Sequence, residues 1–288
     1  MRWTVRGRGL LVAGVGVAAI ALAGCSPTSI SGSAAPQGAT GHSGQGQQQE
    51  TTAASVSELG AQVQHTTTVH NTVHMDMTMT VPEAGSISAT GDMKFGSSVA
   101  EQMTMNLPSV GSMRMVLVDG TIYLKLPSSL TQELGSDKPW AKISLNGDDP
   151  LSQSLGSTTD LAGQADPSQL LKQIASAGTI TKVSHETLNG QPVTHYAITV
   201  DVAKMAQTMT GNAQEKQALS QLGISTMPFD IWVDSNNLPM KIVTKVAYDN
   251  PVSGGSEAVS IQVNYSNWGQ PVTISAPPSS EVGELGGH

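Results

Sequence analysis

The sequence has 288 residues, of which 12% are charged and only 3% are aromatic. It holds 22 acidic and 14 basic residues, for a net charge of −8, and three of the basic residues lie in the first eight positions. This balance disfavours nucleic acid as a partner, and a single cysteine excludes internal disulfides, Cys-rich zinc sites and iron–sulfur clusters.

Residues 1–24 have the organisation of a secretion signal. Three arginines precede an uncharged apolar run at 10–22, which is too short to span a bilayer comfortably. The run ends in Leu22-Ala23-Gly24-Cys25, which resembles the lipobox of bacterial lipoproteins. The resemblance implies cleavage before Cys25 and lipidation of its sulfur, so that the mature chain is anchored at the extracytoplasmic face of the cell membrane without crossing it. An ordinary cleaved signal with a coincidental cysteine is the alternative.

The segments that flank the central part of the chain are polar and poor in large apolar side chains. Residues 25–53 are rich in Ser, Gly, Gln, Thr and Ala, which predicts a disordered tether that follows the lipidated cysteine. Residues 276–288 are predicted to be a disordered tail. One folded domain is therefore expected at 54–275.

Within that domain, apolar and polar residues alternate with the period of two that is typical of strands. In 69–81 the odd positions from Val69 to Val81 are mostly apolar and the even positions are polar. The same alternation continues through 86–95, 101–107 and 113–117. Such a pattern predicts a sheet with one apolar and one solvated face.

Three short turns are predicted to join successive strands into an antiparallel meander of about ten strands. Asp119-Gly120 would place Leu117, Met115 and Met113 opposite Ile122, Leu124 and Leu126, all on one face. Asn189-Gly190 would join 179–188 to 191–200, and Asn236-Asn237 would join 227–234 to 239–249. A last long strand is expected at 257–265, followed by the short apolar run 272–274.

Helices are expected in three places. The segment 54–65 carries Val56, Leu59 and Val63 on one helical face. Asp166-Pro167 supplies an N-cap and a first-turn proline for a helix at 167–177. A broken helix, or two successive helices, is predicted at 201–222.

The order of these elements resembles actinobacterial lipoproteins of the LppX/LprG type. The most specific shared pieces are the run Pro228 to Asp234, the Leu238-Pro239 that follows it, and Asp166-Pro167-Ser168. The resemblance implies an α+β fold, in which a strongly curved antiparallel sheet forms a half-barrel and helices cover its concave face. It also implies an apolar cavity that binds acylated lipid for transport in the cell envelope, with no catalytic residues, no metal and no cofactor.

Methionine is concentrated on the predicted apolar face. Eight of the 13 methionines lie between 75 and 115, all at apolar positions of the strand pattern. Because methionine is flexible and polarizable, these side chains either line an adaptable lipid pocket or fill a core. The candidate cavity wall consists of Met75, Met77, Met79, Met93, Met103, Met105, Met113, Met115, Leu117, Ile122 and Leu124.

Some residue patterns suggest functions other than lipid binding. His70 and His74 beside three methionines suggest a copper site, but in a strand the histidines and methionines point to opposite faces. An enzyme is disfavoured because His185-Glu186 lacks the second histidine of a zinc-protease motif, with Asn189 in its place. A non-catalytic envelope adaptor or sensor, with a filled core and with Trp140, Trp232 or Trp268 at its partner surface, is the main alternative.

Overall fold

The computed structural model describes residues 52–82, 85–96, 99–108, 111–127, 138–144, 166–208, 224–249 and 255–284. The predicted signal peptide, Cys25 and nearly all of the predicted tether lie outside these residues. So do the loop 145–165 and most of the helical segment predicted at 201–222.

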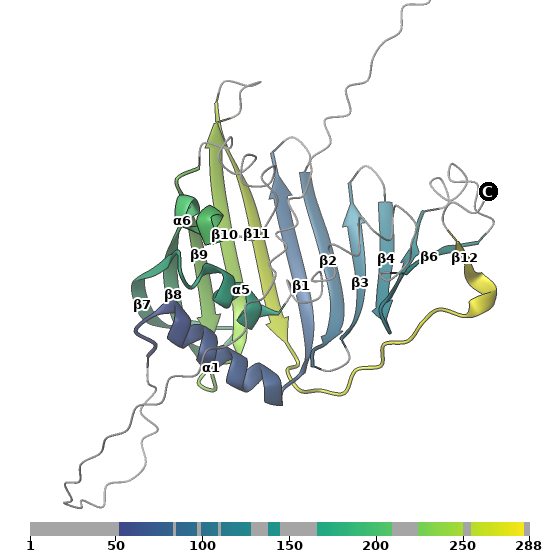
Figure 1. Ribbon diagram of the computed structural model, residues 1–288, viewed down its shortest axis with the longest axis horizontal. Helices are drawn as coiled ribbons and strands as arrows, with labels where there is room; N and C mark the ends of the chain where they lie inside the picture. The colour runs from purple at the N-terminus through teal and green to yellow at the C-terminus, as the bar shows by residue number, and fades with distance from the viewer. Residues whose placement is uncertain are drawn as a thin grey trace, which may run out of the picture.

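The described residues form one open sheet of twelve strands, built from two antiparallel meanders (Figure 1). The first meander is β1 (Thr72–Val81), β2 (Gly85–Lys94), β3 (Ala100–Leu107), β4 (Gly111–Val118), β5 (Thr121–Lys125) and β6 (Trp140–Ser144). The second is β7 (Gly178–Leu188), β8 (Gln191–Asp201), β9 (Thr226–Val233), β10 (Pro239–Asp249) and β11 (Ser256–Ser266). Antiparallel pairing of β1 with β11 joins the two meanders into a single sheet.

The predicted hairpins are confirmed. Asp119 and Gly120 have φ angles of 50° and 68°, and Asn189 and Gly190 of 52° and 80°. Positive φ at both positions is the requirement of the tight turns that match strand twist. Across the first turn Leu117 pairs with Ile122 and Met115 with Leu124, as predicted, whereas the third predicted pair lies beyond the end of β5.

Helix α1 (Val56–Val69) is longer than predicted and begins at the cap Ser55, whose side chain accepts a hydrogen bond from the Glu58 amide. Its last turn replaces the predicted start of the first strand, so the assignment of Val69 to the apolar sheet face is wrong: Val69 is 70% exposed. The strand β1 starts three residues later.

Helix α5 (Pro167–Ile174) has the predicted N-cap: the Asp166 side chain accepts a hydrogen bond from the Ser168 amide. Helix α6 (Val202–Thr208) occupies the described start of the segment predicted at 201–222. Thus the start of each predicted helix is found near its predicted cap or apolar stripe.

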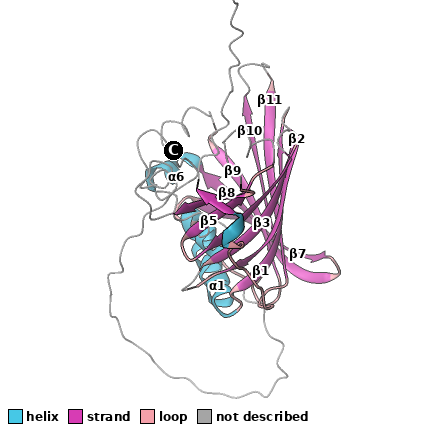
Figure 2. Cartoon of the chain, turned by 90° about the vertical axis from the view of Figure 1, so that its right-hand side faces the viewer, coloured by secondary structure: helices cyan, strands magenta, loops and turns pink. Residues whose placement is uncertain are grey.

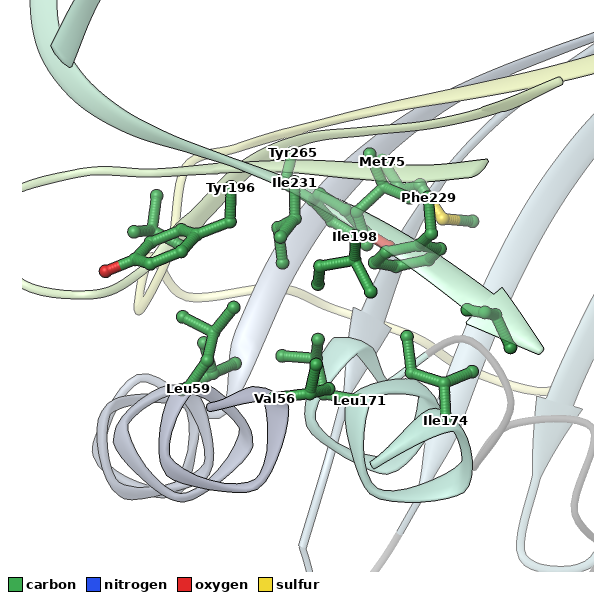
Figure 3. Packing of buried hydrophobic residues seen from close by; sticks show 14 of the residues in the cluster. Val56, Leu59, Met75, Leu171, Ile174, Tyr196, Ile198, Phe229, Ile231 and Tyr265 are labelled. Atoms are coloured by element: carbon green, nitrogen blue, oxygen red, sulfur yellow. The ribbon is translucent and has the colours of Figure 1, made fainter. Parts of the chain in front are cut away.

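The main hydrophobic core lies between one face of the sheet and helices α1 and α5 (Figure 3). Leu59 and Leu171 from the helices face Tyr196, Ile198 and Ile231 from β8 and β9, and all five are almost completely buried. The Tyr196 hydroxyl accepts a hydrogen bond of 3.0 Å from the Ala53 amide, which fixes the segment that leads into α1 against the same core.

The described helices gather at one side of the sheet. In Figure 1, α1, α5 and α6 lie on the side of β7 to β11, and Figure 2 shows the curved sheet from its side with α1 next to one face. The described residues therefore form a curved, open, largely antiparallel sheet with a few helices. The described helices do not cover the whole of its face.

The C-terminal part also differs from the prediction. Within the tail that was predicted to be disordered, residues 279–284 form the short 3-10 helix η1 (Ser279–Glu281) and β12 (Val282–Glu284). Strand β12 pairs in parallel with β6 and forms one edge of the sheet. The predicted apolar run 272–274 is not a strand. Both β6 and β12 were missed because they have only five and three residues and, unlike β5, are not joined to a predicted tight turn that would reveal them.

Candidate functional site

The sheet face against which α1 and α5 pack is called here the inner face. Across β1 to β6 its side chains form rows that run perpendicular to the strands, because residues opposite each other in paired strands lie on the same face. The buried row contains Val73, Met93, Glu101, Leu117, Ile122 and Ile143, which are paired in that order across the six strands. All six are at least 93% buried.

A second row, four residues further along β1, differs in exposure. This methionine row contains Met77, Ala89, Met105 and Met113, paired in that order across β1 to β4. Its three methionines are half-buried rather than buried. Between the two rows lie Met75, Met103, Met115 and Leu124, of which the first two are buried and the last two half-buried.

The eleven predicted wall residues therefore share one face, but in different environments. Met75, Met93 and Met103 belong to the main core, and Met77, Met105 and Met115 pack against it. Leu117 and Ile122 form a smaller buried cluster with Ile143, against which Leu124 packs. Met79 and Met113 are half-buried at the end of the face furthest from α1. Exposure thus rises along the strands from the buried row to the methionine row.

A cavity of about 440 Å³ lies between α1, α5 and the ends of β1 and β2. Its lining is mixed, with Phe95 and Val99 among polar residues; it consists of Gln64, Thr67, Thr68, Asn71, Phe95, Gly96, Val99, Asp166, Ser168 and Gln169. None of the eleven predicted wall residues lines this cavity. The prediction of a large void walled by methionines is thus not met by this cavity.

Two polar groups give this cavity its chemistry. The Ser168 side chain is 1% exposed, and its Oγ atom has no hydrogen-bond partner among the described residues. The Asp166 carboxylate caps α5 next to it. Burial, together with the negative charge of Asp166, raises the pKa of the nearby Tyr265 hydroxyl. The cavity is thus a polar, acidic recess beside an apolar face.

Glu101 is the residue of the inner face that sequence reasoning missed. It stands in the buried row at an apolar position of β3, and only 3% of it is exposed. Burial raises the pKa of its carboxyl group from 4.5 to about 7. The signal was present in the sequence, because Glu101 is in phase with Met103 and Met105 in an alternating strand.

The outer face of β1 to β4 carries a polar network instead. The His74 Nδ1 atom lies 2.7 Å from Asp92 Oδ1, and Gln102 donates a hydrogen bond of 2.8 Å to Asp92 Oδ2. Arg114 in turn donates to Gln102. Burial acts to raise the pKa of Asp92, but the hydrogen bonds from His74 and Gln102 outweigh it and hold that pKa below its usual value.

This geometry separates the residues that suggested a copper site. His74 is on the outer face with Asp92, whereas Met75 is buried in the core beneath the inner face. In the described part of the chain, no group of three or more His, Cys, Asp or Glu side chains is placed to hold a metal ion.

A second polar cluster lies on the outer face of β7 to β10. The ring of His195 stacks on Trp232 with centroids 4.1 Å apart, and its two nitrogens lie 2.9 Å from Glu186 and 2.8 Å from Asp230. Hydrogen bonds from Trp232, His195 and Ser184 lower the pKa of Glu186 to about 2. Each of these groups is satisfied by its neighbours, which is typical of a structural network.

Of the three tryptophans that could mark a partner surface, only Trp232 lies on the outer face with a half-buried ring. Trp140 is 6% exposed, and Trp268 donates a hydrogen bond to the Pro239 carbonyl and packs beside Phe95 and Tyr265. No helix within the described ranges has the length and apolar character needed to cross a membrane.

Comparison with known proteins finds one similar curated sequence and several similar solved structures. No family model matches the chain. It is 27% identical over 228 residues, 77% of its length and 72% of the relative's, to an uncharacterised 31.2 kDa protein in the rplA–rplJ intergenic region of Streptomyces griseus.

Among solved structures the chain is similar to the lipoprotein LppX of Mycobacterium tuberculosis, with 17% identity and a TM-score of 0.46 over 76% of this chain and 98% of that one. It is also similar to LprF of Mycobacterium bovis, with 15% identity and a TM-score of 0.45 over 76% and 97% of the two chains. The resemblance predicted from the sequence motifs is found again in these comparisons.

Proposed function

We propose that this chain is a membrane-anchored lipoprotein of the cell envelope that binds an acylated lipid on its inner face and shields it during transport. Lipidation of Cys25 would hold the domain at the extracytoplasmic face of the membrane, where such a ligand is found. The activity is binding rather than catalysis, and needs no metal or cofactor.

The observation that supports the proposal best is the methionine row. Met77, Met105 and Met113 present flexible apolar side chains that remain half-buried, and the described helices lie toward the half of the sheet formed by β7 to β11. Apolar side chains that remain partly exposed side by side on one face can mark a place where an apolar partner binds. Methionine adapts its shape to ligands of variable shape.

The size of the cavity defines what it can hold. About 440 Å³ is within the range of small-molecule sites and is too small for a whole lipid with two or three acyl chains. Its polar lining suits the head of an amphiphile. In the proposed complex the acyl chains therefore lie along the methionine row, and the polar head is at the end of the face where the cavity opens.

The mechanism would be the exclusion of water from the acyl chains. Each buried methylene group contributes about 0.8 kcal/mol, so affinity should rise steeply with chain length. Because the binding is apolar and non-directional, the methionine row can accept acyl chains of different lengths and branching. Selectivity among lipids would then come from the polar cavity that holds the head.

The test is native mass spectrometry on the chain from residue 25 with Cys25→Ala, purified from an actinobacterial host, together with organic extraction of the bound material. The proposal predicts a discrete lipid mass that is lost in Met105→Asp. The matched control is Asn106→Asp, which places the same charge one residue away on the exposed outer face, and which should keep the lipid.

A protein that is free of lipid, and stays so when acylglycerols or phospholipids are added, would contradict the proposal. That result would favour the adaptor, whose partner surface would then be sought around Trp232 on the outer face.

A further inference from the structure

Glu101 is a buried acid in a row of apolar side chains. Its neighbours in the pairing are Met93 on β2 and Leu117 on β4, which are 0% and 7% exposed. Beyond them the row continues with Val73 and Ile122. An acid at such a position destabilises the fold unless a partner satisfies it, so its presence calls for an explanation.

No such partner is found among the residues that the structure describes. The inner-face residues beside Glu101 on β2 and β4 are Gly91, Met93, Met115 and Leu117, none of which carries a charge. Burial is the one influence on its pKa, with no hydrogen bond or neighbouring charge contributing. By contrast, Asp92 and Glu186 on the outer face each accept several hydrogen bonds.

The position of Glu101 also connects the cavity with the methionine row. Val99, two residues earlier in the chain, lines the cavity, as does Phe95 just beyond the end of β2. Two residues of extended chain span about 7 Å. Met105 of the methionine row lies four residues further along the same strand and on the same face. Glu101 thus lies between the polar recess and the apolar wall.

We propose that Glu101 is the polar recognition residue of the inner face and hydrogen-bonds a free hydroxyl group at the boundary between the head and the acyl chains of the bound lipid. The ligand class is a hydroxyl-bearing acylated lipid, such as a diacylglycerol. This inference rests on the proposed function, because it assumes that an acylated lipid occupies this face.

A hydroxyl group fits this position better than an ammonium group. A neutral carboxyl group both donates and accepts a hydrogen bond, and so does a hydroxyl. An ammonium partner would require two buried charges, whose desolvation offsets much of their attraction. The raised pKa of Glu101, about 7, keeps a substantial fraction of the carboxyl neutral near neutral pH.

The experiment compares two ligands that differ in one hydrogen-bond donor, 1,2-dioleoylglycerol and its 3-O-methyl ether. Their affinities for the chain from residue 25 with Cys25→Ala are measured by titration in native mass spectrometry. 1,2-Dioleoylglycerol should bind about tenfold more tightly than the ether, because the ether has no hydroxyl group to donate a hydrogen bond to the buried Glu101 carboxyl group. Glu101→Leu should abolish this preference while leaving the ether bound.

Glu101→Gln is the matched control, because its amide has nearly the same shape and still donates and accepts a hydrogen bond. It should keep most of the preference. Thermal unfolding of each variant shows that the fold is intact, and Glu101→Leu should be at least as stable as the parent because it removes a buried acid.

The outcomes separate the two proposals. If the parent binds both lipids equally, or if Glu101→Leu keeps the preference, the role of Glu101 is refuted while lipid binding stands. If the parent binds neither lipid and carries none from its host, the proposed function fails, and the role of Glu101 fails with it.

Discussion

The buried row and the methionine row lie on the same sheet face, a few residues apart, yet they differ in packing. Met93 in the buried row is 0% exposed, whereas Met113 in the methionine row is half-buried. The strand pattern is the same in both places, so alternation alone does not distinguish fully buried positions from partly exposed ones. The difference arises from what packs above each row, which depends on the tertiary structure.

The two rows also differ in their chemistry. The buried row combines four aliphatic side chains with Met93 and one acid, and the methionine row combines three flexible thioethers with one alanine. Rigid, fully packed side chains stabilise a fold, and flexible, half-packed ones adapt to a ligand. The inner face can therefore be stable at one end and adaptable at the other.

The largest expected effect is a difference in stability between two equal truncations. Met93→Ala should destabilise the domain by about 2–5 kcal/mol, because it leaves a cavity in a filled core. Met113→Ala should lower the free energy of unfolding by about 1 kcal/mol or less, as for a partly exposed site. Urea denaturation of the lipid-free protein measures both, and equal losses would contradict the distinction between the rows.

The next effect is a pH dependence that arises in the buried row. Glu101 has a pKa of about 7 in the folded protein against an ordinary 4.5. Between pH 4.5 and pH 7 the folded protein keeps a proton on Glu101 that the unfolded chain has released. As far as Glu101 is concerned, the free energy of unfolding is therefore highest below pH 4.5 and falls as the pH rises through 7. The loss is on the order of 3 kcal/mol.

Denaturation of the parent and of Glu101→Gln at pH 4.5 and pH 8 measures this loss. Because the variant keeps the histidines that titrate in the same range, the difference between the two proteins gives the contribution of Glu101 alone. Asp92 and Glu186, whose pKa values are lowered, titrate below this window. A parent and variant with the same pH profile would show that Glu101 is not buried as described.

A smaller effect is expected at the cavity that adjoins the buried row. Asp166→Ala removes the side chain that accepts a hydrogen bond from the Ser168 amide and should destabilise the domain by about 1 kcal/mol. Asp166→Asn keeps a capping oxygen and should lose only a fraction of this. Thermal unfolding compares the two, and an equal loss in both would mean that the charge of Asp166, rather than its hydrogen bond, stabilises α5.

Much of the fold was predictable from local patterns. The turns at Asp119-Gly120 and Asn189-Gly190 depend on residues that tolerate positive φ, so the sequence determines the register of the strands around them. The start of α5 follows from Asp166 and Pro167 in the same way. These features require no knowledge of distant parts of the chain.

Other features depend on contacts that a local pattern does not contain. Val69, the last residue of α1, was predicted as strand because it is in phase with the alternation of 69–81, but the helix continues to it, and Thr66 and Thr68 bond to backbone carbonyls one turn earlier within the helix. The pairing of β12 with β6 joins residues 142 positions apart. Which methionines are buried likewise depends on where α1 and α5 pack.

The central claim, that the methionine row receives acyl chains, is tested most directly by photo-crosslinking. A diacylglycerol with a diazirine in one acyl chain is bound to the chain from residue 25 with Cys25→Ala, irradiated, and the labelled residues are located by peptide mass spectrometry. We expect adducts at Met77, Met105 and Met113 that are lost in competition with unlabelled lipid. Adducts confined to the outer face, or no adduct that unlabelled lipid competes away, would contradict it.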